Sequence, residues 1–508
     1  MPHLHLRDER PRMSYANPGR LKTLVLAIAA IGLALLGLAG PATAASPSLP
    51  DPSKTGSINI HKFETPDTPT GLPNNGTAVS TAGLKPVPGV TFSIQKVSGI
   101  DLTTNQGWVD ANALSGSFNA ANASGSITAA GYTLAAAAGS PVTTDASGNA
   151  ALAGLPLGLY LVTETSWPAG ATPSAPFLVS VPLTDPTSQS AWLYDVNVYP
   201  KNAVTTIAKT VSDQAAVKLG DTVTWTIKAD IPNVSPIDGY KVTDKLDTKL
   251  TYANATAVLA DGTSLVKGTD YTTTLDAATN TLTVDFTAAG RTILAAHPAS
   301  QVVVKVDTTV NAVGEIANTA LLYPNQASFN VTPGQPGGPV VSPPVLTKWG
   351  AITLLKTNGS GAALPGAVFS VYATQADAEA GTNPISLGGQ TTFTAGANGQ
   401  VTISGLRYSD FANGVTVAPG DPGYRDYWLA EVKAPTGYEL LADPIKFDVT
   451  AATTAVGVDL TIKNMPANAG FALPFTGGPG GVFIYLGGAL LLLGALAIGL
   501  TRKRTAQS

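Results

Sequence analysis

Three lysines occupy positions at which a β-strand would turn them toward a hydrophobic core. Alternate side chains of a strand share one face, so Lys356 should lie on the same face as Ile352 and Leu354. In each case an acidic residue and an asparagine follow later in the chain. Each is an even number of residues from apolar neighbours, so strand alternation turns it to the face on which they lie. The three sets are Lys62, Glu164 and Asn202; Lys209, Asp244 and Asn318; and Lys356, Glu431 and Asn464.

A buried lysine, acid and asparagine together favour amide exchange. Burial favours a neutral amine and a protonated carboxyl, because both charged forms are costly away from water. The neutral amine is a nucleophile, and the acid can hydrogen-bond the asparagine carbonyl and make its carbon more electrophilic. The product is a Lys–Asn isopeptide bond, formed with loss of ammonia, that joins the first strand of a domain to its last. In the alternative interpretation the lysines extend to solvent or form ordinary ion pairs.

Lys201 is a candidate for a second reaction, between two molecules. It follows the residues Val198-Tyr-Pro200 and directly precedes Asn202. If Asn202 points inward, strand alternation turns Lys201 outward. An exposed amine suits an intermolecular nucleophile, and a plain linker lysine is the alternative.

The C-terminal end has the pattern of a membrane stop signal. A pentapeptide precedes an apolar stretch at 482–501 and a basic tail at 502–508. About 20 apolar residues suffice to cross a bilayer, and Lys and Arg prefer its cytoplasmic side. The sequence therefore predicts one membrane helix, with an ordinary anchor preceded by a chance pentapeptide as the alternative. The pentapeptide consists of Leu473, Pro474, Phe475, Thr476 and Gly477.

The N-terminal end has the pattern of a signal peptide at 1–45. Basic residues precede the apolar stretch Leu24–Gly40, and Ala42-Thr-Ala44 supplies the small residues that signal peptidase accepts. A retained N-terminal membrane helix is the alternative. The exported protein would begin at about Ala45.

The composition limits what the exported part can be. The chain has no Cys, so disulfides, thiolate metal sites and thiol nucleophiles are excluded. A net charge of −4 over 508 residues argues against nucleic acid as a partner. Abundant Thr, Val, Ala, Gly and Pro, with few amphipathic helix patterns, predict an all-β protein of several sandwich domains. No cofactor or metal site is expected, and bound Ca²⁺ is left open.

Two blocks of the sequence resemble each other, which indicates one domain type used twice. Ile58-Asn-Ile-His-Lys62 corresponds to Ile352-Thr-Leu-Leu-Lys356, and Tyr160–Glu164 corresponds to Tyr427–Glu431. The first block contains an Ala/Gly/Ser-rich insertion at Ala111–Gly139. The expected segments are the signal peptide at 1–45, an N-terminal immunoglobulin-like domain at 46–200, a middle one at 201–331, a Pro/Gly linker at 332–344, a C-terminal domain at 345–466, a sorting-signal region at 467–481, the membrane helix at 482–501 and the cytoplasmic tail at 502–508.

Three motifs resemble those of sortase-assembled pilins. Leu473–Gly477 resembles the LPxTG signal of sortase substrates, Tyr427–Tyr438 is similar to the E-box of Cna B-type domains, and Trp192–Asn202 resembles the pilin motif. By this resemblance the chain is a major shaft pilin of a Gram-positive fimbria, with three Cna B-type β-sandwich domains. Its first domain fits less well, because Trp167-Pro-Ala-Gly170 stands where the box would end in Ala-Pro-x-Gly-Tyr.

The resemblance also implies the roles of the residues. A pilus sortase would cut between Thr476 and Gly477 and hold the Thr476 carbonyl as a thioester, which Lys201 of another subunit attacks. The implied partners are identical subunits in a covalent homopolymer, the pilus sortase, a housekeeping sortase, a peptidoglycan precursor, a tip pilin, and host or bacterial surface receptors. The implied location is the cell wall, reached through a precursor held transiently in the membrane.

Two other function classes are weighed against the shaft pilin. A wall-anchored adhesin or tip pilin would use the sandwiches as a stalk, but the insertion at Ala111–Gly139 is poor in the aromatic and polar anchors of a ligand site. An enzyme is disfavoured, because only His61 and His297 remain after processing and neither lies in a catalytic or zinc motif. The chain is therefore expected to be a sortase substrate whose only catalysis is its own isopeptide formation.

Overall fold

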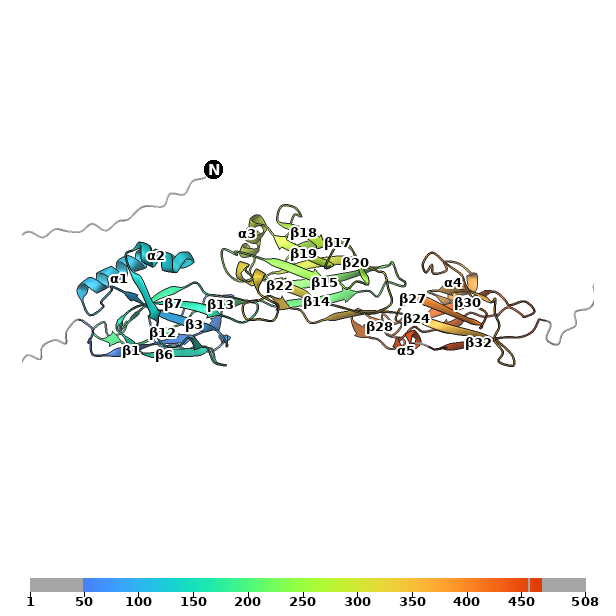
Figure 1. Cartoon of the computed structure of the whole chain (residues 1–508), viewed down its shortest axis with the longest axis horizontal. Coiled ribbons are helices and arrows are strands. Elements are labelled where there is room, and N and C mark those ends of the chain that lie inside the picture. Colours follow the sequence, from blue (N-terminus) through green and yellow to red (C-terminus); the bar gives the residue numbers. More distant parts are fainter. Residues whose placement is uncertain (1–48, 456, 468–508) are drawn as a thin grey trace, which may run out of the picture. The chain divides into compact units, whose positions relative to one another are not determined.

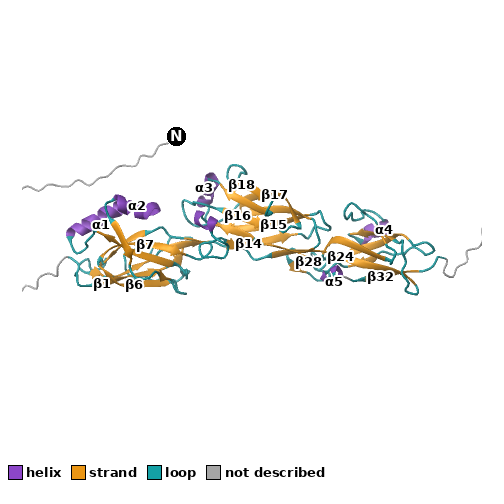
Figure 2. Cartoon of the chain, in the orientation of Figure 1, coloured by secondary structure: helices purple, strands orange, loops and turns teal. Residues whose placement is uncertain are grey.

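The computed structural model describes residues 49–455 and 457–467, and strands dominate this part of the chain (Figures 1 and 2). Within these ranges, no helix is long and apolar enough to cross a membrane. The predicted signal peptide, the predicted membrane helix and the basic tail lie outside the described residues. So do all five residues of the predicted sorting motif, Leu473, Pro474, Phe475, Thr476 and Gly477.

The N-terminal domain places the first strand of the chain beside a late one. Strand β1 pairs in parallel with β12, with Ile58 opposite Val196 and Ile60 opposite Val198, and β6 lies on its other side. A second sheet has the order β4-β3-β7-β9, with β5 also on β3, and a small third sheet has the order β2-β13-β8. The strands are β1 (Thr55–His61), β2 (Phe63–Glu64), β3 (Thr91–Ser98), β4 (Thr133–Ala137), β5 (Val142–Thr143), β6 (Asn149–Pro156), β7 (Gly158–Ser166), β8 (Ala171–Thr172), β9 (Phe177–Val181), β10 (Leu183–Thr184), β11 (Trp192–Leu193), β12 (Asp195–Val198) and β13 (Lys201–Val204).

The insertion of the N-terminal domain is mainly helical and begins before the predicted Ala111. Helix α1 (Asn105–Ser117) starts where the Thr104 side chain accepts a hydrogen bond from the Gly107 amide, and η1 (Ala120–Asn122) and α2 (Ala123–Ala129) follow. Figure 1 shows both α-helices on the same side of the domain. Their apolar residues Leu114 and Ile127 pack with Leu161 of β7 in a small core, so the insertion covers one sheet of the domain.

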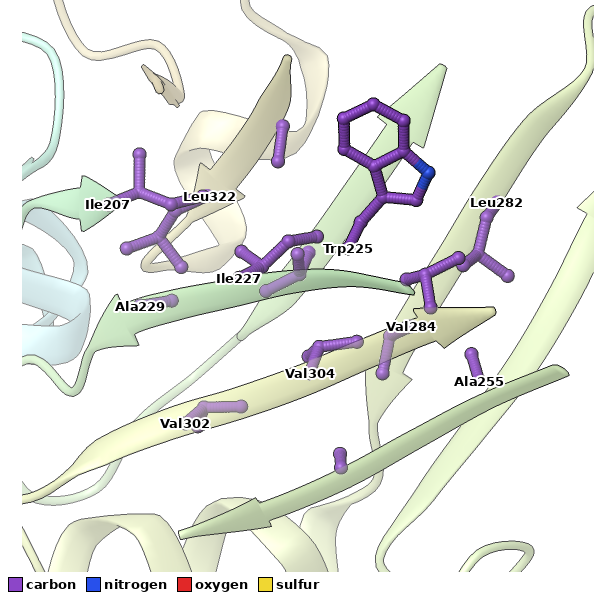
Figure 3. Close-up of a cluster of buried hydrophobic side chains, with 14 of the residues drawn as sticks. Ile207, Trp225, Ile227, Ala229, Ala255, Leu282, Val284, Val302, Val304 and Leu322 are labelled. Atoms are coloured by element: carbon purple, nitrogen blue, oxygen red, sulfur yellow. The ribbon is translucent and has the colours of Figure 1, made fainter. Parts of the chain in front are cut away.

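The middle domain consists of two sheets that enclose the largest core. The sheets have the orders β14-β15-β20-β17 and β18-β19-β16-β22-β23, and their apolar side chains meet around the fully buried Trp225 (Figure 3). Alternation along β15 produces this, because Trp225, Ile227 and Ala229 share one face. The elements are β14 (Ile207–Ser212), β15 (Thr222–Asp230), β16 (Lys241–Lys245), β17 (Leu250–Leu259), β18 (Tyr271–Asp276), β19 (Thr281–Phe286), α3 (Ala288–Ala296), β20 (Gln301–Val310), β21 (Gly314–Asn318), β22 (Ala320–Tyr323), η2 (Gln326–Asn330) and β23 (Val340–Val341).

One long strand, β24 (Val345–Asn358), belongs to two domains. Its first part pairs with β21, from Val345 opposite Asn318 to Trp349 opposite Gly314, and Trp349 lies in the core of the middle domain. Its second part pairs with β27 and, in parallel, with β32 of the C-terminal domain. The two parts meet at Gly350, where an added Cβ atom would collide with the Thr454 hydroxyl.

The observed strands differ from the predicted boundaries in three places. Residues 201–204, which we assigned to the middle domain, form β13 and pair with β2 and β8 of the N-terminal domain. Residues 345–349, which we assigned to the C-terminal domain, complete the middle one. The predicted linker at 332–344 includes β23, which pairs with β22. All three differences come from long-range strand pairing, which local patterns do not reveal.

The C-terminal domain repeats the arrangement of the N-terminal one, with its first strand parallel to its last. One sheet contains β24, β27 and β32, and the other has the order β26-β25-β30-β31. Their facing side chains form a core that includes Phe369, Leu429 and Ile462. The elements after β24 are β25 (Val368–Tyr372), α4 (Gln375–Ala380), β26 (Phe393–Thr394), β27 (Gln400–Arg407), β28 (Phe411–Ala412), β29 (Val415–Thr416), β30 (Tyr427–Lys433), β31 (Ile445–Phe447), α5 (Ala451–Thr454) and β32 (Leu460–Asn464).

Candidate cross-linking and polymerisation sites

In the C-terminal domain, strands of both sheets bring Lys356, Glu431 and Asn464 together. All three residues are at most 5% exposed. The Lys356 ammonium contacts the Asn464 side-chain oxygen and lies 3.0 Å from Glu431 Oε1. The Asn464 amide donates to both Glu431 oxygens, at 3.0 and 2.9 Å. Amine, amide and acid are therefore in mutual contact, as the reaction requires.

In the middle domain, the acid lies between the other two groups. Lys209 Nζ donates to Asp244 Oδ2 at 2.6 Å, and the Asn318 amide reaches the same oxygen at 3.4 Å. The second Asp244 oxygen and the Asn318 oxygen are buried and have no hydrogen-bond partner among the described residues. Burial lowers the pKa of Lys209 to about 8 and raises the pKa of Asp244, and each shift favours the neutral form of its group.

The N-terminal domain assembles the set whose motif fits the family pattern least well. Lys62, which follows β1, and Asn202 in β13 are fully buried, and Glu164 in β7 is 8% exposed. Lys62 Nζ contacts Glu164 Oε1, and the Asn202 amide donates to Glu164 Oε2 at 3.0 Å. Burial lowers the pKa of Lys62 to about 8. The structure thus brings together all nine residues chosen by strand parity, in three separate sets.

The structure adds a fourth residue, Ser174, to the N-terminal set. Its hydroxyl and its main-chain amide contact Glu164 and Asn202. Sequence reasoning missed Ser174 because it lies in the loop between β8 and β9, where no strand periodicity applies. The sequence holds one signal: Ser174 follows Glu164 by ten residues, and in the repeated domain Leu441 follows Glu431 by the same number.

Lys201 lies beside this set but is not part of it. Asn202 is fully buried as predicted, but Lys201 is partly buried and not exposed. The reason is that burial does not alternate along this short strand, since Ala203 is buried and Val204 is exposed. Lys201 Nζ donates to the Tyr199 carbonyl at 3.3 Å, and burial lowers its pKa. Tyr199 and Pro200 also line a cavity of about 590 Å³ that extends to Trp108 of α1. A partly desolvated amine is a better nucleophile than a fully solvated ammonium, because burial favours its neutral form.

Isopeptide formation in the middle domain is expected to have a bell-shaped pH profile. The reactive form, neutral Lys209 with protonated Asp244, holds the same number of protons as the ion pair of charged Lys209 and ionised Asp244. The fraction of the reactive form, and therefore the rate, should not change with pH while the pair holds this one proton. Because the pKa of Lys209 is about 8, the pair loses that proton above about pH 8 and the rate should fall. Because the pKa of Asp244 is raised, the fall in rate toward low pH should begin at a higher pH than the usual pKa of an aspartate.

The profile can be measured on chains dissolved from inclusion bodies in denaturant and refolded at a series of pH values. Loss of ammonia is followed by intact mass, and proteolytic mapping assigns it to the Lys209–Asn318 pair. A rate that continues to rise well above pH 8 would contradict a role for the shared proton.

Comparisons with known proteins agree with this architecture. A family described as "Gram-positive pilin subunit D1, N-terminal domain" matches residues 53–203, and one described as "Prealbumin-like fold domain" matches residues 350–464. The chain is 34% identical to a fimbrial subunit type 1 of Actinomyces viscosus. The alignment covers 94% of this chain and 96% of that subunit.

Two solved structures are similar over most of the chain. The full-length major pilin SpaD from Corynebacterium diphtheriae has a TM-score of 0.64 and 28% identity, with 83% of this chain and 99% of that chain covered. The major pilin SpaA from the same organism has a TM-score of 0.57 and 25% identity, with 81% and 100% covered. Both of these proteins are major pilins, which are structural subunits of surface fibres. The chain belongs to the fimbrial subunits of Gram-positive bacteria and is a pilin.

Proposed function

We propose that this pilin is the shaft subunit of a sortase-assembled fimbria, joined head to tail through Thr476 and Lys201. The observation that carries the proposal is the partly buried Lys201 amine, which directly follows the cavity-lining residues Tyr199 and Pro200 and has a pKa lowered by burial. A sortase cysteine would attack the Thr476 carbonyl, break the bond to Gly477 and hold the acyl group as a thioester. The neutral Lys201 amine of another subunit would then displace the thiol and form an amide.

The rest of the sorting motif would serve recognition. Leu473, Pro474 and Phe475 precede the cleaved bond and complete the pentapeptide that the sortase reads. In this scheme they contribute no reacting atom, because the acyl group comes from Thr476 and the leaving amine from Gly477.

Similarity to major pilins supports the same assembly. The pili of SpaA are described as a modular assembly with stabilising isopeptide bonds. A housekeeping sortase would end growth by transferring the last subunit to a peptidoglycan-precursor amine, which anchors the fibre in the wall. In this scheme the protein is a substrate, and its own chemistry is limited to its cores.

Co-expression with a pilus sortase tests the polymer. Boiled cell-wall extracts should contain a ladder of covalent multimers that requires the sortase. Mass spectrometry should find the Thr476 carbonyl joined to Lys201 Nζ. A protein that remains monomeric with an active sortase would contradict the shaft assignment and favour a single-copy wall-anchored adhesin.

We also propose that the buried sets form internal isopeptide bonds. In each, lysine Nζ would bond to the asparagine side-chain carbon, the bond from that carbon to Nδ2 would break, and ammonia would leave with protons passed on by the acid. The support is the mutual contact of Lys356, Glu431 and Asn464, and the burial of all three sets.

The intact mass of the exported chain should be lower than its sequence mass by one ammonia for each bond. Proteolytic mapping should recover Lys209 joined to Asn318, Lys356 joined to Asn464 and, in the N-terminal domain, Lys62 joined to Asn202. An unmodified mass after complete folding would refute all three bonds. A smaller loss gives the number of bonds formed, and the peptide map then identifies which set is inert.

A further inference from the structure

The three buried sets differ in which additional groups contact them, and Ser174 is the main difference. Ser174 lies in the loop between β8 and β9, and its hydroxyl donates to Glu164 Oε1 at 2.5 Å. The same hydroxyl accepts a hydrogen bond from Lys62 Nζ at 3.3 Å. Glu164 therefore receives a neutral hydroxyl donor in addition to the lysine and the asparagine.

The main-chain amide of Ser174 contacts the asparagine. Its N–H donates to Asn202 Oδ1 at 2.8 Å and lies 3.3 Å from Glu164 Oε1. Asn202 Oδ1 is the oxygen that would gain negative charge when Lys62 attacks the side-chain carbon. A fixed N–H at this distance can stabilise that charge, as donors do in an oxyanion hole.

The C-terminal domain has a different residue at the corresponding place. Leu441 follows Glu431 by ten residues, as Ser174 follows Glu164, and its N–H donates to Glu431 Oε2 at 3.0 Å. Its side chain has no hydroxyl and packs against the apolar core. In the middle domain, Asn318 Oδ1 has no hydrogen-bond partner among the described residues. Among these three sites, the N-terminal one alone pairs a hydroxyl on the acid with a main-chain donor on the asparagine oxygen.

We propose that Ser174 is a catalytic residue of the N-terminal cross-link and sets its rate through two opposing contacts. This inference rests on the proposed Lys62–Asn202 bond. The hydroxyl donates to Glu164 Oε1, the same oxygen that Lys62 Nζ contacts, so it competes with transfer of the Lys62 proton to that oxygen and slows the reaction. The main-chain N–H stabilises the negative charge on Asn202 Oδ1 and speeds it. Nζ–Cγ bond formation, Cγ–Nδ2 cleavage and departure of ammonia proceed as in the other domains.

Two substitutions separate the contacts. Ser174→Ala removes only the hydroxyl and should speed Lys62–Asn202 formation by about tenfold, the effect of one hydrogen bond to a charged group. Ser174→Pro removes the hydroxyl and the N–H, and should be slower than Ser174→Ala by about tenfold or more. Both rates are measured on full-length exported chains during refolding, by mass and by mapping of the Lys62–Asn202 peptide.

Two controls keep the test specific. Ser180→Ala changes a serine in β9 that lines the same cavity as Ser174, and it should leave the rate unchanged. The Lys356–Asn464 bond of the same molecules reports refolding, so a folding defect would slow both bonds. If Ser174→Pro does not fold, the Ser174→Ala rate still decides whether the hydroxyl slows the reaction, and a rate that does not rise overturns the proposal.

A Ser174→Ala rate equal to or below that of the unaltered chain would overturn the inference. Equal rates for folded Ala and Pro variants would overturn the role of the N–H. A chain that polymerises through Lys201 but has no Lys62–Asn202 bond would overturn the inference and leave the proposed shaft function intact. A chain that fails to polymerise but forms the Lys62–Asn202 bond at the expected rates would overturn the shaft function and leave the inference intact.

Discussion

Replacing Lys201 by alanine is expected to abolish the sortase-dependent ladder and leave monomers that are still processed at Thr476. The variant removes the only amine in the pilin motif but leaves Asn202 and its buried partners in place. Because the acyl-enzyme then has no lysine acceptor, chain growth should fall below detection while monomer reaches the wall. Immunoblots of boiled wall extracts measure the ratio of multimers to monomer.

Two control variants make this result specific to the Lys201 amine. Lys201→Arg keeps the positive charge but supplies a guanidinium that stays protonated, so it should fail like the alanine variant. Lys85→Ala removes another lysine of the same domain, whose side chain is 79% exposed, and should polymerise normally. A ladder that persists in Lys201→Ala, or one that is lost in Lys85→Ala, would assign the nucleophile to another residue.

Replacing Glu431 by alanine is expected to prevent the Lys356–Asn464 bond and to destabilise the C-terminal domain strongly. Without the carboxyl, no group among the described residues contacts both partners and could pass protons between the amine and the leaving ammonia. The lost cross-link closes a loop of 108 residues, which corresponds to about 4–5 kcal/mol in the chain-entropy treatment. For a domain of this size the melting temperature should fall by roughly 20 °C. Intact mass and calorimetry measure the two effects.

Asn464→Ala serves as the matched variant for stability. It also prevents the bond but keeps the Lys356–Glu431 ion pair, whereas Glu431→Ala leaves a buried ammonium without its acid. Glu431→Ala should therefore lower the stability of the C-terminal domain more than Asn464→Ala. Glu379→Ala, at an exposed position of α4, should keep both the bond and the stability. A Glu431→Ala chain that still loses ammonia from the C-terminal domain would remove the proposed role of the acid.

The candidate site was predictable because it depends on a short local period. Strand side chains alternate every residue, so the parity of Lys356 with Ile352 and Leu354 could be counted from the sequence, and the structure buries all three. The same counting correctly placed Asn202 in the interior, but it predicted an exposed Lys201, which the structure has partly buried. The all-β fold class followed from composition and turn residues, and the comparisons confirm it.

Most of the features that the sequence did not predict depend on partners distant along the chain. Nothing near Val345 indicates that it pairs with Asn318, because the register of two strands is decided by their joint fit to a core. Ser174 was missed for another reason: it is only ten residues from Glu164, but it lies in a loop, where strand alternation does not apply. The early start of α1 at Asn105 reflects packing of Leu114 on the sheet, which the weakly amphipathic insertion does not display.

The sharing of β24 between two domains has a consequence for the order of events during export. A chain that emerges from its N-terminus cannot complete the middle domain until residues 345–349 have also emerged, because they pair with β21 and supply Trp349 to its core. The Lys209–Asn318 bond should therefore form late, only after part of the following domain is outside the membrane. A chain that ends at Pro344 should accordingly lose ammonia from Lys209 and Asn318 far more slowly than one that ends at Ala467.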